Sequence, residues 1–399
     1  MEKSRKKSKK LIKISFIFIA VLLSLSLSIS YYAYSHIKRE MKKTYVESMP
    51  AERTIDTKKP LAIMLLGVDT GDSERGGAES WNGNTDSQIV LTLNPQTKTT
   101  TIISIQRDTM ANILDDKGNN ISKQKVNAAY PLGYMRTGIS DAAKYALRTI
   151  SAQSGISIEN FVALNMEGLV NLVDDVGGID VVNDSGGDIY ISNTEPQYKA
   201  IVPFIGEGKK QHINGEQALV FSRDRYHLKN GDYGRSAHQR QVLQQLMTKI
   251  LSINSITKYQ TFLKNISNDF KTNISFDAKN LLSLIAYKDC FEKIVSIQYE
   301  GLGSMVTDSL GRESSYQFIP TNVYLAVQNL LRKSMGNPII QTLDDNLITY
   351  EKEFESKPNY YCLPSVTVTE KGKNIIYGVD LNGNFVSITD ENRSNYIAK

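Results

Sequence analysis

Four arginines lie within one 21-residue stretch, Phe221–Gln241, which reads FSRDRYHLKNGDYGRSAHQRQ. They are Arg223, Arg225, Arg235 and Arg240. A guanidinium group binds a carboxylate or a phosphate through parallel N–H donors. The stretch therefore predicts a solvated charged surface, an ion-paired cluster, or a site for a phosphate or a nucleic acid.

The residues after these arginines have the spacing of an amphipathic helix. Toward the N-terminus, the same helix face continues with Gln239, His238 and Arg235. The predicted first turn therefore directs polar groups inward. Buried polar groups without a partner cost a few kcal/mol. We therefore expect an anion bound by Arg235, Gln239 and the helix start, whereas Arg240 lies off this face and is predicted to be at the surface. The apolar positions are Val242, Leu243, Leu246, Met247, Ile250 and Leu251.

Acidic residues mark the ends of three predicted strands. Asp69 follows LLGV, Asp86 directly precedes an apolar run, and Arg107 and Asp108 close a third strand. Sites of α/β folds are built at strand ends. Two carboxylates beside a pyrophosphate would bind Mg²⁺, or Mn²⁺ in its place; the alternative is a set of surface ion pairs of little energetic weight. With only four His residues, none at metal-ligand spacing, we expect no zinc site.

Apolar runs and turn signals alternate along the chain, which predicts an α/β layered domain. Ser140 is a candidate cap for the first helix, and Asn382-Gly383 marks the turn of a hairpin over 375–388. FSRDRY would end a strand with Arg223 and Arg225 pointing the same way. We predict strands at 61–67, 88–94, 99–105, 161–166 and 218–222, and helices at 141–155, 167–178 and 235–254.

The N-terminus predicts a membrane anchor. Residues 14–34 carry no charge over 21 positions, which as a helix would span about 32 Å. Seven Lys or Arg precede this run and four follow it closely, which places the N-terminus in the cytoplasm and the bulk outside the cell. We predict a cytoplasmic basic tail at 1–13, a transmembrane helix at 14–35 and a linker at 36–60. A cleaved signal peptide ending near SLSIS is the alternative.

Charge is distributed unevenly along the chain. Residues 1–43 hold 11 of the 47 Lys and Arg and two of the 42 Asp and Glu, which leaves a net charge of −4 on the remainder. A non-specific nucleic-acid binder is basic over its folded part, so nucleic acid is excluded as the expected partner. Cys290 and Cys362, the two cysteines, are expected either to pair or to be separate buried thiols.

The ordered motifs LLGVD, NTDS, SIQRDT, KVNAAY, VDDVGGIDV, INGEQAL, SRDRY and GDYGRSAHQRQ resemble the LytR-CpsA-Psr family of cell-envelope proteins. The resemblance is dense over residues 61–255 and weaker to about residue 330. It implies an extracellular catalytic domain at 61–330, built as an α/β/α sandwich around a mixed sheet with an apolar cleft for a lipid. Residues 331–399 would be a C-terminal extension of unknown role.

The family resemblance also implies a reaction and a site. Members transfer a glycosyl phosphate from a polyprenyl-pyrophosphate carrier to a peptidoglycan hydroxyl at the outer face of the membrane. By motif, Asp69 and Asp86 would hold Mg²⁺. Asp69 is the first candidate for the base and Asp108 the second, although Asp108 could instead orient arginines. The catalytic set is Asp69, Asp86, Arg107 and Asp108, and the pyrophosphate set is Arg107, Arg223, Arg225, Arg235 and Gln239.

Some positions depart from the family pattern. Gln106 replaces a usual Pro, Asn84 a frequent Arg, Thr85 a Ser and His238 a common Arg. The segment between Asp69 and Asp86 also looks longer than usual. In that segment Arg75 could replace the missing arginine, and Trp81 would either stack on a sugar or pack on the domain.

Two other functions are alternatives to that of an enzyme. A non-catalytic binder of lipid-linked glycan would need the arginines but not the pair Asp69 and Asp86. A membrane-bound regulator of transcription would need a cytoplasmic nucleic-acid-binding part, and residues 1–13 are too short to fold into one.

Overall fold

The computed structural model describes most of the chain from residue 44 onward. The membrane span predicted at 14–35 lies outside the described residues except for Ser35, and Arg75 lies outside them as well. Among the described helices none is both long and apolar enough to cross a bilayer. The described residues are 35, 39, 44–47, 55–69, 81–183, 187–189, 206, 208–228, 230–251, 265, 269–275, 283, 286–307 and 311–397.

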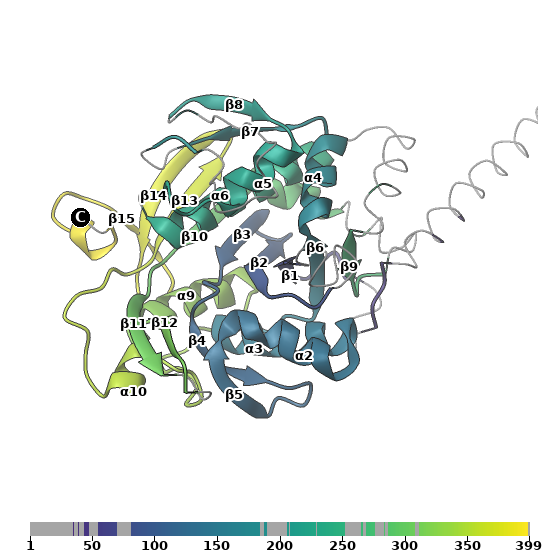
Figure 1. Cartoon of the computed structure of the whole chain (residues 1–399). Helices are drawn as coiled ribbons and strands as arrows, with labels where there is room; N and C mark the ends of the chain where they lie inside the picture. The colour runs from purple at the N-terminus through teal and green to yellow at the C-terminus, as the bar shows by residue number, and fades with distance from the viewer. Residues whose placement is uncertain are drawn as a thin grey trace, which may run out of the picture.

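A nine-stranded mixed sheet forms the centre of the molecule (Figure 1), in the order β15-β14-β13-β10-β3-β2-β1-β6-β9. The pairs β1–β6 and β3–β10 are parallel, and the other neighbours are antiparallel. The strands are β1 Leu61–Val68, β2 Thr85–Asn94, β3 Thr99–Ser104, β6 Asn160–Asn165, β9 Phe270–Thr272, β10 Lys293–Gln298, β13 Ser365–Glu370, β14 Lys373–Val379 and β15 Phe385–Ser387.

Both faces of the sheet are buried, because successive side chains of a strand point to opposite faces. On β1, Ala62, Met64 and Leu66 pack into one core cluster, and Leu61 and Ile63 pack into another. The layer on the first face contains α2 Ala129–Thr137, α3 Ile139–Ser154 and α9 Thr321–Ser334; the opposite layer contains α4 Met166–Asp175, α5 Gly215–Arg223 and α6 Gly231–Leu251 (Figure 1). The predicted α/β/α sandwich is confirmed.

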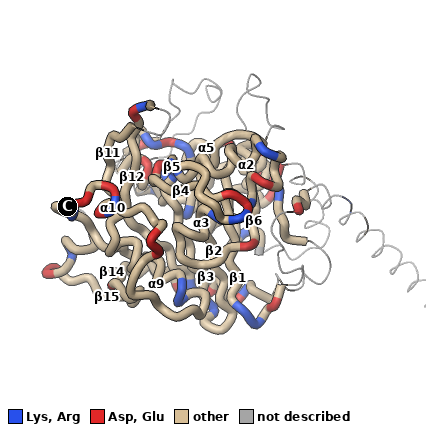
Figure 2. The backbone as a smooth tube through the Cα atoms, turned by 90° about the horizontal axis from the view of Figure 1, so that it is seen from below, with Lys and Arg blue, Asp and Glu red and all other residues tan. Residues whose placement is uncertain are grey.

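Hairpins and short helices complete the fold. In the view of Figure 2, basic and acidic positions are interspersed along the described backbone. The remaining elements are β4 Met110–Leu114, β5 Asn120–Lys125, β7 Ile179–Val182, β8 Lys210–Ile213, β11 Leu302–Thr307, β12 Glu313–Phe318, α10 Tyr350–Phe354 and the 3-10 turns η2 Val126–Ala128, η4 Tyr287–Glu292 and η5 Arg393–Asn395.

Most predicted elements are present within a few residues of their expected bounds. The hairpin over 375–388 is confirmed, with Val379 paired to Phe385 and Gly383 at φ +70° in its turn. The helix predicted to end at Gly155 does so, at φ +68°. Ser140 does not cap that helix, because its hydroxyl donates to the Glu47 carbonyl at 2.5 Å.

The strand predicted at 218–222 is wrong. These residues belong to helix α5, which Asn214 caps by accepting from the Gln217 amide while the Gln217 side chain accepts from the Asn214 amide. A short apolar run fits a buried helix as well as a strand, and the capping pair upstream decides between them. Arg223 therefore ends a helix and Arg225 follows in a loop, so the two do not alternate along a strand.

Two segments predicted as peripheral pack on the domain. In the expected linker, Val46 donates to the Thr272 carbonyl at 2.8 Å and Ile55 is buried in the core. Toward the C-terminus, β13 to β15 continue the central sheet, and α9 spans the boundary expected at residue 330. Cys290 is buried, Cys362 is partly exposed, and both are free thiols.

Candidate functional site

Asp69 directly follows β1, and Asp86 lies on the adjacent strand β2 at the same end of the sheet. Gly67 pairs with Ser87 and Val68 pairs with Thr85, so Asp86 is an extra residue, as in a β-bulge. The Asp69 amide donates to the Asn84 carbonyl at 2.9 Å, directly beyond the end of β1. Bulges redirect a side chain and are common beside active sites.

A glycine permits this arrangement. A Cβ atom built on Gly83 would lie 1.4 Å from the Asp69 carbonyl oxygen, so a side chain cannot fit there without moving the backbone. The close approach keeps the chain before β2 against the end of β1. The local sequence Gly83-Asn84-Thr85-Asp86 thus brings the backbone before Asp86 against the end of β1, which Asp69 directly follows.

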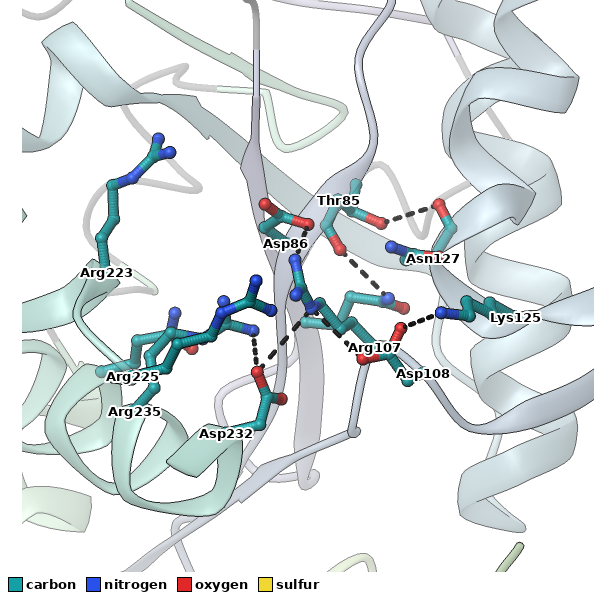
Figure 3. Close-up of polar contacts among 12 residues, drawn as sticks. Thr85, Asp86, Arg107, Asp108, Lys125, Asn127, Arg223, Arg225, Asp232 and Arg235 are labelled. Atoms are coloured by element: carbon teal, nitrogen blue, oxygen red, sulfur yellow. Dashed lines mark hydrogen bonds and ion pairs between the residues drawn. The ribbon is translucent and has the colours of Figure 1, made fainter. Parts of the chain in front are cut away.

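Arg107 is the centre of the site (Figure 3). Its Nη1 lies 2.9 Å from Asp86 Oδ1, and its Nε lies 3.5 Å from Asp108 Oδ2 and 3.7 Å from Asp232 Oδ1. Burial alone would lower the pKa of Arg107, but the attraction of these three carboxylates outweighs burial and raises the pKa above its ordinary value. The predicted Arg107 therefore joins residues from three separate segments.

Asp108 faces two cations. One oxygen lies 2.8 Å from Lys125 Nζ and the other lies 3.5 Å from Arg107 Nε. The Asp108 carbonyl also accepts from the Gln317 amide of β12 at 2.9 Å. This geometry fits the orienting role that the sequence left open for Asp108. Lys125, inside the motif KVNAAY, is a site residue that the sequence analysis missed.

Asp232 is the other missed residue. Helix α6 begins at Gly231, one turn before its predicted start, so Arg235 lies in the second turn. Asp232 occupies the first turn, where the helix dipole favours negative charge, and its Oδ1 lies 2.6 Å from Arg235 Nη2. A carboxylate of the chain therefore stands at the helix start where we expected the anion, and binding of an anion there stays a prediction. The i, i+3 spacing of Asp232 and Arg235 was the available signal.

Arg235 is buried, and the burial of its guanidinium lowers its pKa. The nearby charges of Arg107 and Arg225 lower that pKa further, and Asp232 and Asp86 oppose them. This crowding of positive charge marks a place where an added anion would be stabilised.

The remaining predicted arginines lie at different positions. Figure 3 shows Arg225 beside Arg235, and Arg223 with its guanidinium turned away from Asp232. Arg225 donates to the Tyr226 hydroxyl at 2.9 Å and its guanidinium lies 4.9 Å from that ring. The Arg223 guanidinium contacts Met166 Sδ. Arg225 thus joins the cluster, whereas Arg223 lies at its edge.

Gln239 and His238 fasten α6 to α5. The side-chain amide of Gln239 donates to the Ser222 carbonyl at 3.1 Å. The His238 ring stacks on Phe221 at 3.8 Å between centroids, and its Nδ1 lies 3.2 Å from the Phe221 carbonyl. In this structure, Gln239 therefore engages the helix before it, and His238 is part of the core.

The prediction of a surface position for Arg240 is wrong. Only 5% of this residue is exposed, and it donates to Ser104, Ser296 and Gln298 of β3 and β10. Helix α6 packs with one side on α5 and with another on the sheet, so a position off the first apolar face is still buried.

Two departures from the family pattern have structural roles. Trp81 is buried in the core, with Lys271 Nζ 5.6 Å from its ring. Of the two predicted roles, the structure therefore shows packing on the domain. Gln106 is buried and accepts from the Ser236 hydroxyl at 3.3 Å, which ties the end of β3 to α6. Gln106 thus positions the segment that carries Arg107.

The donor set at the strand ends fits only one kind of metal site. In the described part of the chain, no group of three or more His, Cys, Asp and Glu side chains could hold a metal. Mg²⁺ bound together with phosphate needs only one or two carboxylates. Asp86, whose side chain is 30% exposed, meets Arg107 through Oδ1, and Asp69 directly follows the adjacent strand β1. These two carboxylates would supply the protein ligands of a Mg²⁺ ion that also takes phosphate oxygens.

A mixed α/β/α sandwich with arginines and carboxylates interleaved at its strand ends defines a class of α/β proteins with a charged site. Within that class, the chain belongs to the LytR-CpsA-Psr family, whose model (LytR_cpsA_psr family) matches residues 27–333. The chain is 38% identical over 309 residues to Biofilm regulatory protein A of Streptococcus mutans, covering 77% of this chain and 70% of that protein.

Two further relatives agree with this assignment. The polyisoprenyl-teichoic acid–peptidoglycan teichoic acid transferase TagU of Enterococcus faecalis is 35% identical, over 76% of this chain and 90% of that protein. The crystal structure of protein gbs0355 from Streptococcus agalactiae superposes with a TM-score of 0.65 at 38% identity, covering 76% of this chain and 97% of that one.

Proposed function

We propose that this chain is a membrane-anchored extracellular phosphotransferase that moves a glycosyl phosphate polymer from a polyprenyl-pyrophosphate carrier to a peptidoglycan hydroxyl. The observation that carries the proposal is the cluster in which Arg107 contacts Asp86, Asp108 and Asp232, and Arg235 contacts Asp232. An anion binder alone has no need of so many carboxylates. The transferase named among the relatives acts on a polyisoprenyl-linked teichoic acid and peptidoglycan.

The reaction forms one P–O bond and breaks another. The acceptor oxygen attacks the glycan-side phosphorus, the bond to the bridging oxygen breaks, and polyprenyl phosphate leaves with the released electron pair. Arginines stabilise the charge that develops on the leaving phosphate without a proton shuttle. We assign Arg225 and Arg235 to the phosphates, with Arg107 between them and the carboxylates.

The acceptor hydroxyl loses its proton in this step. Both oxygens of Asp108 face cations, Arg107 and Lys125. We therefore assign Asp108 to orienting Arg107 and keep Asp69 as the candidate base. Asp69 and Asp86 would hold Mg²⁺ against the pyrophosphate, where the ion would supply positive charge at the phosphate oxygens.

The transfer itself is the test. The full-length chain in detergent micelles is mixed with a polyprenyl-pyrophosphate-linked glycan and peptidoglycan, and released polyprenyl phosphate is measured. We expect release that depends on the acceptor and stops when a chelator removes Mg²⁺. Binding of the lipid with no release under any metal condition would instead favour a non-catalytic binder.

The anchor and its orientation are part of the proposal. The uncharged run at 14–34 and the excess of basic residues before it support a single span with the N-terminus in the cytoplasm. A protease added to intact cells should digest the domain that contains the central sheet. Full protection of that domain would contradict the orientation.

A further inference from the structure

Arg240 is a buried cation with neutral partners. Its Nε donates to Ser296 Oγ and its Nη1 to Ser104 Oγ, each at 3.0 Å, and its Nη2 donates to Gln298 Oε1. In the part of the chain that the structure describes, no carboxylate is within ion-pair distance of it. Arg107, by contrast, has three carboxylates around it.

A charge in this position is unfavourable for the folded protein. Removing a guanidinium from water without an opposite charge costs free energy that three hydrogen bonds offset only in part. Burial lowers the pKa of Arg240 to about 10, which still leaves the group charged at neutral pH. A leucine or methionine would fill the same space between α6 and the sheet without that cost.

The position of Arg240 relates it to the site. Ser104, its partner, is the last residue of β3 and lies three residues before Arg107, a span of about 10 Å along an extended chain. On α6, Arg240 follows Arg235 by five residues, about 7.5 Å along the helix axis. In general, two unit charges about 10 Å apart at an effective dielectric constant of about 20 change an affinity by roughly tenfold for each charge of the anion.

We propose that Arg240 is a positioning residue whose buried charge strengthens the binding of the pyrophosphate group without touching it. The inference rests on the proposed function, because the counter-charge is then the substrate. The arginines around Asp232 would contact the phosphates, and Arg240 would add a fixed positive charge where α6 meets β3 and β10. The alternative is a purely structural role, in which its three hydrogen bonds only join α6 to β3 and β10.

The test compares Arg240→Met, which removes the charge, with Arg240→Lys, which keeps it. Binding of inorganic pyrophosphate and of inorganic phosphate to the full-length chain in micelles is measured by calorimetry. We expect Arg240→Met to bind inorganic phosphate about tenfold more weakly and to lose more affinity, up to about 100-fold, for pyrophosphate because pyrophosphate carries more charge. Arg240→Lys should stay within about threefold of wild type for both anions, the difference expected when only the hydrogen bonds change.

A matched control is Arg148→Met, since Arg148 is an exposed residue of α3 on the opposite face of the sheet. It removes the same charge and should leave both affinities unchanged. If Arg240→Met does not fold, Arg240→Gln takes its place, because its amide can still donate to the serines.

Three results would overturn the inference. They are an unchanged pyrophosphate affinity in the neutral variant, an equal loss in Arg240→Lys, and an equal loss for phosphate and pyrophosphate. Each differs from failure of the proposed function, in which wild-type protein binds pyrophosphate but transfers nothing.

Discussion

The site has two halves with opposite charge balances. The strand half lies at the ends of β1, β2 and β3, and the helix half lies at the start of α6 and in the loop before it. On the strand half, Asp69, Asp86 and Asp108 outnumber Arg107 and Lys125. On the helix half, the arginines outnumber the carboxylate, with Arg225 and Arg235 close to Asp232 (Figure 3).

The pKa directions follow this difference. Carboxylates raise the pKa of Arg107 on the strand half despite its burial, whereas burial and neighbouring arginines lower the pKa of Arg235 on the helix half. This difference supports our proposal that the strand half holds the metal ion and accepts the proton of the acceptor, and that the helix half binds phosphate. Asp232, which contacts both arginines, links the two halves.

Removal of Arg107 should have the largest effect, because it belongs to both halves. In Arg107→Met, Asp86, Asp108 and Asp232 lose their shared cation. We expect the transfer rate to fall by about 1,000-fold and the folded state to lose about 3 kcal/mol. Rates of polyprenyl phosphate release and chemical denaturation check these two expectations. Full transfer by the variant would remove Arg107 from the centre of the site.

Gly83→Ala should damage the strand half alone. The new Cβ would collide with the Asp69 carbonyl oxygen, so Asp69 and Asp86 lose their relative positions. A shift of about 1 Å in a catalytic group can reduce a rate by about 100-fold, while the affinity for pyrophosphate should remain. Gly303→Ala is the matched control, because its Cβ would make only an ordinary 3.4 Å contact with Gln317. Equal loss of rate and affinity in Gly83→Ala would mean that the halves are not separable.

Asp232→Asn should make the net charge of the helix half more positive. Removing this negative charge should tighten pyrophosphate binding by roughly tenfold, because Arg107 and Arg235 then attract the anion without competition. The folded state should lose about 1–3 kcal/mol in the absence of ligand. Calorimetry and thermal melting report the two effects, with the exposed Asp345→Asn as control. Weaker pyrophosphate binding would show instead that Asp232 positions the arginines.

The smallest expected effect is a change in the stability of the folded protein with pH. Burial lowers the pKa of Arg240 from its ordinary value to about 10, so above pH 10 the folded protein releases this proton while the unfolded chain retains it. The unfolded state then holds more protons, and stability contributed at this site rises with pH. Burial raises the pKa of the adjacent Tyr299, which therefore stays protonated in the same range.

We therefore expect the wild type to gain stability relative to Arg240→Met as the pH rises from about 9 to about 11. The free energies of unfolding of both proteins in denaturant, measured across that range, check the trend. A constant difference between the two proteins would mean that the group does not titrate there.

Much of the strand half could be predicted from the sequence, because a buried strand followed by an aspartate is a local pattern. Asp69, Asp86, Arg107 and Asp108 all lie at strand ends where the apolar runs indicated. The helix half was predicted less well, since its geometry depends on packing. The run at 218–222 resembles a strand by composition and folds as α5.

The dependence on tertiary packing also explains which residues the sequence prediction missed or misplaced. The α6 start depends on Gly231 and Asp232, which the apolar periodicity does not reach. Arg240 was misplaced because the pattern of one helix face cannot show that another face meets β3 and β10. Lys125 reaches Asp108 from the end of β5, a contact between distant segments that no local pattern contains.

The central claim is that the helix half binds pyrophosphate and the strand half performs the transfer. The most direct test measures both quantities for Asp86→Ala and Arg235→Ala in the same assay. We predict that Asp86→Ala abolishes Mg²⁺-dependent release of polyprenyl phosphate but binds the pyrophosphate lipid within about threefold of wild type, and that Arg235→Ala weakens that binding by at least about tenfold. Near wild-type transfer by Asp86→Ala, or unchanged lipid affinity in Arg235→Ala, would contradict the account.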